Sequence, residues 1–530
     1  MQAFWSDTLN RAELLAQKQP DPERYITVVV HRNHSFELLA PVVNIFLGLV
    51  KTHADFLYSD YDDSLSFSGI FPIKADMHML WLDMGRYGGG NELTDWLVER
   101  IRVLKDLGVG KILVACHDLQ TDALPSLSNV LVCDLSKILS VLGDKALDAR
   151  LEAYSGTRLS NKACLEAARA LGTRFIPALL YPVLKAIVLD CDNTLYAGVL
   201  GEDGIQEVRP YLALQTLLRS LKEQGFMLSL VSKNEEEDVK RLFMERLDFP
   251  LRWEDFAAIG INWNAKAENI RAIAATLNIS TDAMLFIDDN PGEILHVANE
   301  IPEVNLLEAS SPENTLAALR HYPRLFKATT TLEDRVRSDD VKANTERVAL
   351  QKQLSPQEYL KQLKIQLDFM VNPLQLSTRI TELLNKTNQF VFTYLRPTAD
   401  DVHRYLHDAD KCVIAAAMFD RLSDSGVIAV LLATKKRRCL HIAELAVSCR
   451  ALGRGVETGM VLKMMQVAGQ ALGAHDYEFH YKKGPRNKPA LIWLQDIYSE
   501  ELQDSGSFFL PNESIVPDLA GVDVRVLCDK

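Results

Sequence analysis

Residues 185–195 read Lys-Ala-Ile-Val-Leu-Asp-Cys-Asp-Asn-Thr-Leu, and the expected fold is built around this stretch. Its apolar run is typical of a buried strand, and the run ends in two aspartates one residue apart, Asp190 and Asp192. A strand that delivers two carboxylates to its end suits Mg²⁺-assisted phosphoryl chemistry. One carboxylate can attack phosphorus while the other exchanges a proton with the leaving group. Cys191, between them, is a nucleophile of a different kind.

Three further motifs are expected to join this strand end. Ser232 closes the predicted strand 228–232, and its hydroxyl suits a phosphate oxygen near a helix start. Lys266 is a cation for phosphate charge. A second apolar run, 284–287, ends in Asp288 and Asp289. Because the carboxyl ends of strands in an open parallel sheet meet at one crevice, the sequence predicts that these motifs converge. An isolated Asp-x-Asp is often a loop cap, but four motifs in this order favour a catalytic site.

Over about residues 185–300, these motifs resemble those of the haloacid dehalogenase (HAD) superfamily. The resemblance implies that Asp190 is the nucleophile, forming an aspartyl-phosphate, and that Asp192 is the general acid and base. It implies that Ser232 and Lys266 hold the phosphoryl group. The implied Mg²⁺ ligands are Asp190, the backbone carbonyl of Asp192 and an acid from the pair Asp288-Asp289, with Asp289 the direct ligand and Asp288 oriented toward Lys266.

A narrower resemblance, to the FkbH-like branch of that superfamily, covers roughly residues 150–500. It rests on the stretch 190–204 (Asp-Cys-Asp-Asn-Thr-Leu-Tyr-Ala-Gly-Val-Leu-Gly-Glu-Asp-Gly), on 386–390, Asp420-Arg421, 448–457 and Asn487-Lys488. Members include glyceryl transferase/phosphatases of polyketide pathways. These enzymes take the three-carbon unit of 1,3-bisphosphoglycerate, remove phosphate, and hand a glyceryl group to an acyl carrier protein as a thioester. One departure is Tyr196-Ala197, where the family often has Trp-Gly. We expect it to leave the catalytic groups untouched and to affect acceptance of the acyl portion.

Glyceryl transfer would need a thiol beside the carboxylates. Cys191 could carry the acyl group if the chain turns sharply after the strand. Neighbouring strand residues point to opposite faces, however, and an apolar-flanked cysteine is more often a buried structural residue, which is the alternative interpretation of Cys191. Cys449 is the rival thiol, because a helix N-terminus close to it would lower the pKa of that thiol.

The stretch Arg450-Ala-Leu-Gly453-Arg454-Gly455 follows a predicted strand, 440–447, and enters a predicted helix, 456–471. It resembles the pyrophosphate loop of GNAT-type acyltransferases, in which glycines and a helix N-terminus accept phosphate. The resemblance implies that this loop binds the phosphopantetheine arm of a carrier protein, or coenzyme A. Acetyl transfer from acetyl-CoA is the competing interpretation, with Glu444 and Glu457 as candidate bases. A plain glycine turn is the structural alternative.

Residues 25–180 alternate apolar and helical runs, with strands expected at 26–31, 76–83, 111–116 and 130–133, which predicts a small parallel sheet. This alternation of strands and helices resembles flavodoxins or SGNH hydrolases, but the Gly-Asp-Ser and Asp-x-x-His motifs of a working SGNH hydrolase are missing. We therefore expect a scaffold or docking role and set Ser35 aside as a nucleophile. The predicted fold class is α/β in three domains: an SGNH-like or flavodoxin-like domain (1–180), a Rossmann-like HAD domain (181–330) and a GNAT-like α+β domain (364–530). A helical connector (331–363) is predicted between the last two.

Composition limits the remaining function classes. With 58 basic and 71 acidic residues, the chain has a formal net charge of −13, which argues against non-specific nucleic-acid binding. None of its eight cysteines forms a Cys-x-x-Cys pair, so a zinc site has little support from the cysteine spacing. No signal peptide is evident and the apolar stretch 38–50 is too short to cross a bilayer, so a cytoplasmic protein is expected. The alternatives to the glyceryl transferase are a plain phosphatase of a small phosphorylated metabolite and a non-catalytic module that binds a carrier protein.

Overall fold

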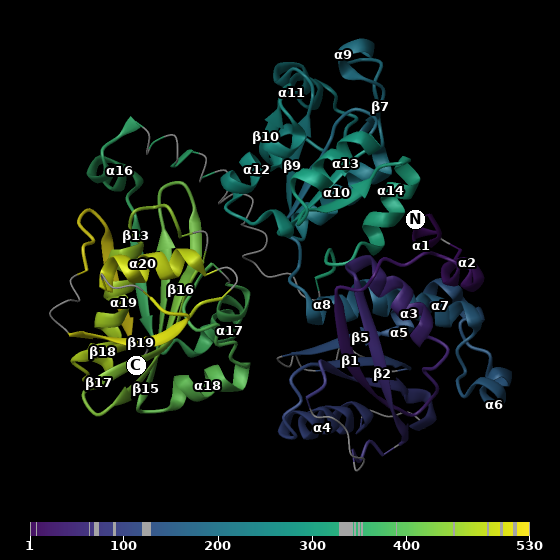
Figure 1. Cartoon of the computed structure of the whole chain (residues 1–530), viewed down its shortest axis with the longest axis horizontal. Coiled ribbons are helices and arrows are strands. Elements are labelled where there is room, and N and C mark those ends of the chain that lie inside the picture. The colour runs from purple at the N-terminus through teal and green to yellow at the C-terminus, as the bar shows by residue number, and fades with distance from the viewer. Residues whose placement is uncertain are drawn as a thin grey trace. The chain divides into compact units, whose positions relative to one another are not determined.

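The structure is a computed structural model (Figure 1). It describes residues 2–6, 8–62, 64–67, 74–87, 92–118, 124, 129–327, 343, 346–347, 350, 353–387, 389–448, 451–484, 487–498, 502–511 and 517–528. The chain divides into two compact units. The first unit comprises Met1–Gln224, Asn234–Arg252 and Asp282–Thr330, and the second comprises Gly225–Lys233, Trp253–Thr281 and Thr331–Lys530. The three-domain division stays a prediction.

The first sheet has the order β2-β1-β3-β4-β5, with every neighbouring pair parallel. Its strands are β1 (Arg24–Arg32), β2 (Thr52–Tyr61), β3 (Met77–Asp83), β4 (Ile112–His117) and β5 (Val130–Asp134). Its helices are α1 (Gln2–Trp5), α2 (Arg11–Leu15), α3 (Ala40–Leu47), α4 (Glu92–Asp106), α5 (Leu135–Leu139), α6 (Glu152–Ser155), α7 (Asn161–Ala170) and α8 (Ile176–Leu180). Strands β3 and β4 are buried at every residue, as expected for parallel strands covered on both faces.

The second sheet has the order β10-β9-β6-β11-β12. Its strands are β6 (Ala186–Leu189), β9 (Met227–Ser232), β10 (Phe256–Ile261), β11 (Met284–Asp288) and β12 (Asn305–Glu308). The pairs β10–β9, β11–β6 and β11–β12 are parallel. Around these strands lie α9 (Leu200–Asp203), α10 (Leu212–Glu223), α11 (Glu236–Glu245), α12 (Lys266–Leu277), α13 (Pro291–Glu300), α14 (Pro312–His321) and the short antiparallel pair β7 (Tyr196–Ala197) and β8 (Arg209–Pro210).

Numbered within this sheet by chain order, its strands run 3-2-1-4-5, the order of doubly wound α/β folds. The direction of winding reverses between the first strand, β6, and the fourth, β11. Ligands of such sheets bind outside the carboxyl ends of the strands at that reversal. The first strand is the one that ends in Asp190-x-Asp192, and the fourth ends in Asp288-Asp289.

The third sheet is mixed, with the order β19-β18-β17-β16-β15-β13-β20 and β14 paired to β17. Its strands are β13 (Gln366–Val371), β14 (Phe390–Val391), β15 (Lys411–Phe419), β16 (Asp424–Lys436), β17 (Cys439–Val447), β18 (Asp476–Lys482), β19 (Ser505–Pro511) and β20 (Asp523–Cys528). One face packs against α19 (Glu457–Leu472) and α20 (Lys488–Tyr498), and the other against α17 (Ser377–Lys386) and α18 (Ala399–His407) (Figure 1). Much of the predicted connector lies outside the described residues, but α16 (Pro356–Leu363) is helical as expected.

Among the residues that the structure describes, every helix is too short or too polar to cross a membrane.

Candidate active site

Three acidic side chains meet where the winding of the second sheet reverses. The N–H of Asp190 donates to the carbonyl of Ile287 at 3.0 Å, so the chain continues beside β11 past the end of β6. One carboxylate oxygen from each of Asp190, Asp288 and Asp289 lies within 4.8 Å of the others. Asp190 is 5% exposed and Asp288 is fully buried. Carboxylates so close together in the interior repel one another, and a hard divalent cation with oxygen ligands, such as Mg²⁺, fits this donor set.

The loops that carry these carboxylates are tied together by Thr194. The N–H of Asp289 donates to Thr194 Oγ1 at 3.1 Å, and this hydroxyl lies 3.5 Å from Asp289 Oδ1. Asp288 Oδ1 accepts the N–H of Asn290 at 2.9 Å, at the start of α13. No role was predicted for Thr194, although a hydroxyl two residues after the Asp-x-Asp pair was a usable signal. The separate roles predicted for the two aspartates, with Asp289 binding Mg²⁺ directly and Asp288 oriented toward Lys266, stay a prediction.

The Asp192 side chain is held by three donors. Its Oδ1 accepts the Tyr196 hydroxyl at 2.8 Å and the Leu200 N–H at 3.0 Å. Its Oδ2 accepts the Asn234 side-chain amide at 2.9 Å. The turn that allows this begins at Asn193, which has a left-handed backbone with φ 51°. The acid predicted to exchange protons is therefore fixed in position beside the predicted nucleophile.

Tyr196 overturns one expectation from the sequence. The departure at Tyr196-Ala197 was expected to leave the catalytic groups untouched, and this is wrong, because the Tyr196 hydroxyl donates directly to Asp192. Tyr196 is fully buried. Burial, followed by the charges of Cys191 and Asp192, raises the pKa of Tyr196 well above its usual value. The hydroxyl consequently keeps its proton and remains a donor.

Cys191 lies in the protein interior. Its side chain is fully buried, and its carbonyl accepts the N–H groups of Thr194 and Leu195 at 3.3 and 2.9 Å as the chain turns. A covalent acyl carrier must meet a donor and later a second thiol, and a fully enclosed sulfur gives neither one access. The structure therefore favours the structural role for Cys191 over the acyl-carrying role.

Ser232 closes a strand, as the sequence predicted, and Lys266, for which no element was predicted, begins a helix. Ser232 is the last residue of β9 and Lys266 the first of α12, and they are 3% and 4% exposed. Both belong to the second unit, whereas the carboxylates belong to the first. Their convergence with the carboxylates stays a prediction. Asn234, which holds Asp192, follows Ser232 by two residues in the chain.

The predicted phosphate loop has the expected strand-loop-helix context, between β17 and α19. Gly453 and Gly455 are exposed and have φ values of 83° and 77°, a backbone that favours glycine. Cys449 and Arg450, the rival thiol and the first residue of the motif, lie outside the described residues.

Arg454, also predicted to bind the cofactor, is engaged inside the protein. Its side chain is 1% exposed, and its guanidinium donates to Asp420 Oδ2 at 3.0 Å and to Ser425 Oγ at 2.7 Å. Its backbone N–H donates to Glu457 Oε1 at 2.9 Å. Arg347 binds the same Asp420 at 2.8 Å. The Arg454 guanidinium thus has a structural partner in place of the phosphate that the motif predicted.

Glu444 is an anchor for the segment that follows β14. Its carboxylate is fully buried and accepts the N–H groups of Phe392 and Leu395 at 3.0 and 2.8 Å and the Thr393 hydroxyl at 2.8 Å. Burial raises the pKa of Glu444, and these hydrogen bonds oppose the rise. The two candidate bases, Glu444 and Glu457, therefore both accept hydrogen bonds from their own chain.

Ser35 lies three residues after the end of β1. Its hydroxyl donates to Glu37 Oε2 at 2.6 Å. Nearby strand ends bring together Asp83, His117 and Asp118. Arg158 donates to both oxygens of Asp83, at 2.7 and 2.5 Å. The Asp83 carboxylate therefore already has a counter-charge from the protein.

Comparison with known proteins gives only weak structural likenesses. No family model matches the sequence, and no curated protein matches it. Among solved structures, the N-terminal part of protein BF1531 from Bacteroides fragilis, which contains a phosphatase domain and is complexed with Mg²⁺, is 22% identical. It covers 60% of this chain and 98% of its own, with a TM-score of 0.45.

Two acetyltransferases are similar to a smaller part of the chain. A single-site mutant of spermidine N-acetyltransferase SpeG from Vibrio cholerae is 13% identical, covers 28% of this chain and 96% of its own, and has a TM-score of 0.22. Aminoglycoside acetyltransferase AAC(6')-Ib in complex with coenzyme A is 15% identical, covers 28% and 96%, and has a TM-score of 0.21. With TM-scores this low, the function has to be inferred from the residues of the chain itself.

Proposed function

We propose that this protein is a Mg²⁺-dependent phosphatase and transferase of HAD type, with Asp190 as the nucleophile. The observation that carries the proposal is the meeting of Asp190, Asp288 and Asp289 at the reversal point of the second sheet. A structural role alone does not require three carboxylates to converge there. The position of Asp192, held by three donors two residues after Asp190, supports the same chemistry.

In the proposed reaction, a carboxylate oxygen of Asp190 attacks the phosphorus of a phosphate ester. The ester P–O bond breaks, and Asp192 gives its proton to the departing oxygen. A water molecule then attacks the aspartyl-phosphate, loses its proton to Asp192 and releases inorganic phosphate. Mg²⁺, held by Asp190, Asp288 and Asp289, would supply charge neutralisation for the phosphate oxygens. Ser232 and Lys266 are proposed to orient the phosphoryl group.

The proposed substrate is the three-carbon unit of 1,3-bisphosphoglycerate, and the proposed acceptor is an acyl carrier protein. The sequence resemblance to FkbH-like proteins supports both assignments. The exposed turn at Gly453 and Gly455, before the long helix α19, supports a docking site for a phosphopantetheine arm. Because Cys191 is buried, the carrier's own thiol, or Cys449, is proposed to attack the acyl carbon of 1,3-bisphosphoglycerate. The bond from that carbon to the phosphate oxygen breaks, the thiol proton goes to solvent, and inorganic phosphate leaves as the thioester forms.

The phosphatase proposal is tested by measuring phosphate release from small phosphate esters with Mg²⁺. Asp190→Asn removes the nucleophile and is expected to abolish release, and a chelator is expected to do the same in the unaltered protein. Asp238→Asn, on the exposed side of α11, is the matched control and should retain full activity. Release by the Asp190→Asn protein would contradict the assignment of the nucleophile.

Glyceryl transfer is tested by intact-protein mass spectrometry after incubation with Mg²⁺ and 1,3-bisphosphoglycerate, with and without a holo carrier protein. A glyceryl adduct on the carrier is expected. Phosphate release from many small substrates without any adduct would favour a plain phosphatase. Binding of the carrier without phosphate release would favour the third candidate, a non-catalytic module that binds carrier proteins.

A further inference from the structure

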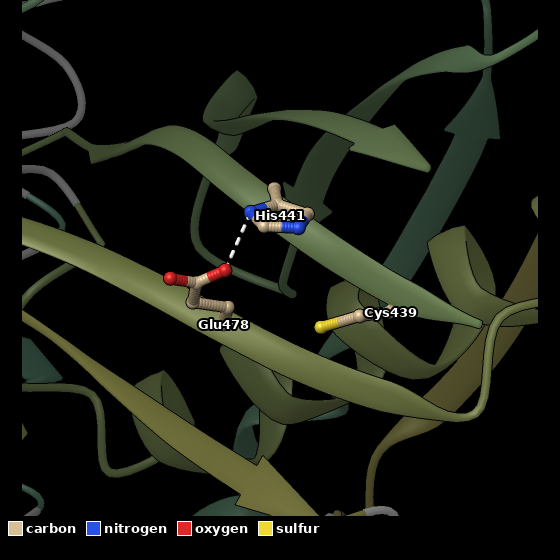
Figure 2. A group of neighbouring side chains, drawn as sticks. All are labelled: Cys439, His441 and Glu478. Carbon is tan, nitrogen blue, oxygen red and sulfur yellow. Dashed lines mark ion pairs between the residues drawn. The ribbon is translucent and has the colours of Figure 1, made fainter. Parts of the chain in front are cut away.

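A cysteine, a histidine and a glutamate meet on the third sheet, and none of them takes part in the proposed phosphoryl chemistry. Cys439 and His441 lie two residues apart on β17, and Glu478 lies on the neighbouring strand β18. The parallel register pairs His441 with Glu478 directly. Since side chains alternate along a strand, Cys439 and His441 share a face of the sheet. Figure 2 shows the three side chains together, two from one strand and one from the next.

The distances suit a shared ion. One ligand atom from each residue lies within 4.8 Å of the others. His441 Nδ1 lies 2.6 Å from Glu478 Oε2, and these side chains are 18% and 27% exposed. In a tetrahedral zinc site, bond lengths of about 2.0–2.3 Å put ligand atoms roughly 3.4 Å apart. Small side-chain rotations would therefore bring the three groups to coordination distance.

A second histidine lies close to these three residues, although it is outside the group whose ligand atoms lie within 4.8 Å of one another. His480 follows Glu478 by two residues, and its ring is stacked against that of His441, with centroids 5.9 Å apart and planes inclined by 17°. Its Nε2 lies 4.0 Å from Glu478 Oε1. Asp476, paired with Cys439 in the strand register, adds a second carboxylate to this face. Sulfur, nitrogen and oxygen donors thus gather on two adjacent strands.

We propose that Cys439, His441 and Glu478 bind a transition-metal ion, Zn²⁺, with His480 as the fourth ligand. A thiolate and an imidazole select zinc over Mg²⁺, which prefers oxygen ligands throughout. On binding, the Cys439 thiol loses its proton to solvent and its sulfur bonds to the metal. The ion pair of His441 and Glu478 explains two of the side chains but leaves the adjacent thiol without a role.

The proposed ion links the two strands where their pairing begins. Strands β17 and β18 are paired only from Cys439 to Ile442 and from Asp476 to Phe479, although both strands continue. A metal bridge at His441 and Glu478 fixes the register of this short parallel pair. The expected role is structural, so zinc should raise the unfolding temperature of the protein without being needed for phosphate release.

The test uses the full chain, stripped with a chelator and kept in excess Mg²⁺ so that the carboxylate site of the second sheet does not take up zinc. Bound Zn²⁺ is counted by elemental analysis after gel filtration, and Co²⁺ is used as a spectroscopic probe for a metal-thiolate bond. Wild-type protein is expected to retain one equivalent of zinc and to show a cobalt-thiolate absorption band. Cys439→Ser should lose the band, and both Cys439→Ser and Glu478→Gln should bind zinc at least ~10-fold more weakly.

The matched control is His403→Gln. The ring centroids of His403 and His407 lie 4.0 Å apart on the exposed side of α18, so the variant removes a histidine outside the proposed site. This variant should keep both the zinc and the cobalt-thiolate band. Zinc retention unchanged in Cys439→Ser, or lost in His403→Gln, would overturn the proposal. Circular dichroism with chelator present establishes that each variant is folded. Should Cys439→Ser fail to fold, Glu478→Gln decides, because it keeps the size of the side chain.

Discussion

At the scale of single residues, the chemistry proposed here depends on how Asp192 is held. A carboxylate that exchanges protons must keep its position relative to the nucleophile through both half-reactions. The Tyr196 hydroxyl, the Leu200 N–H and the Asn234 amide fix that position, and they come from strand β7, the start of α9 and the segment before α11. Tyr196 acts on the reaction through Asp192, so it is a positioning residue.

Tyr196→Phe removes one of these three donors while preserving the buried ring. A hydrogen bond to a charged group contributes about 1.5–3 kcal/mol, so kcat for phosphate release should fall roughly 10-fold or more, with KM little changed. Steady-state kinetics with a small phosphate ester measure both constants. Tyr154→Phe, at a residue that is 91% exposed, is the control and should behave as wild type. An unchanged kcat in Tyr196→Phe would show that the contact has no catalytic role.

At the scale of elements, one buried aspartate joins three segments of the second unit. Asp420, directly after β15, binds Arg347 at 2.8 Å and Arg454 at 3.0 Å, and the side chains of all three are at most 1% exposed. Arg347 comes from the segment before α16, and Arg454 from the loop before α19. The loop predicted to receive phosphate is thereby anchored to the core of the third sheet through this one carboxylate.

Asp420→Asn leaves two buried guanidinium groups without their counter-charge. Removing one partner from a buried charge network costs about 3–5 kcal/mol, so the variant should unfold at markedly lower urea concentration. The transition can be followed by tryptophan fluorescence, since Trp493 lies on α20, a helix that packs against the same sheet. Asp496→Asn, an exposed position on α20, is the matched control. A midpoint equal to that of the control would contradict a structural role for the network.

The elements that were predicted best are the buried ones. Strands β6, β9 and β11 were predicted to within one residue, because uninterrupted apolar runs mark strands covered on both faces. Strand β2 was missed, since its half-exposed, partly polar residues do not form such a run. Strand β12 is short and only partly buried, and it was missed for the same reason. Helix α19 was predicted with both ends displaced by one residue.

At the scale of the whole molecule, buried histidines of the first unit make its stability depend on pH. Burial, and then the charge of His78, lowers the pKa of His31 to about 4. Burial, and then His117, lowers the pKa of His34 to about 3. Burial, and then Arg169, lowers the pKa of His321 to about 3. In the unfolded chain these groups titrate near the ordinary value of about 6.5. At pH values between the folded-state pKa of each histidine and about 6.5, the folded state therefore binds fewer protons than the unfolded state.

Stability from these histidines is complete above about pH 6.5 and is lost as the pH falls toward 4 for His31 and toward 3 for His34 and His321. Each group contributes up to about 1.4 kcal/mol per pH unit in that window. Thermal unfolding followed by calorimetry should show the transition of the first unit moving to lower temperature between pH 7 and pH 5. His34→Asn should flatten this slope, whereas His403→Asn, at an exposed position, should leave it unchanged. A slope identical in both variants would refute the assignment.

The α/β class, the buried strands and the carboxylates of the candidate active site could all be predicted from the order of the amino acids. These features follow from local pattern: apolar runs define strands, and polar residues directly after a run lie at its end. Three-dimensional packing was needed to establish that Asp190, Asp288 and Asp289 meet, that Tyr196 reaches Asp192, and that Cys191 and Arg454 face inward. Packing also brought Cys439 to His441 and Glu478. The physical reason is that strand order and side-chain direction depend on contacts between segments distant in the chain, which no local pattern records.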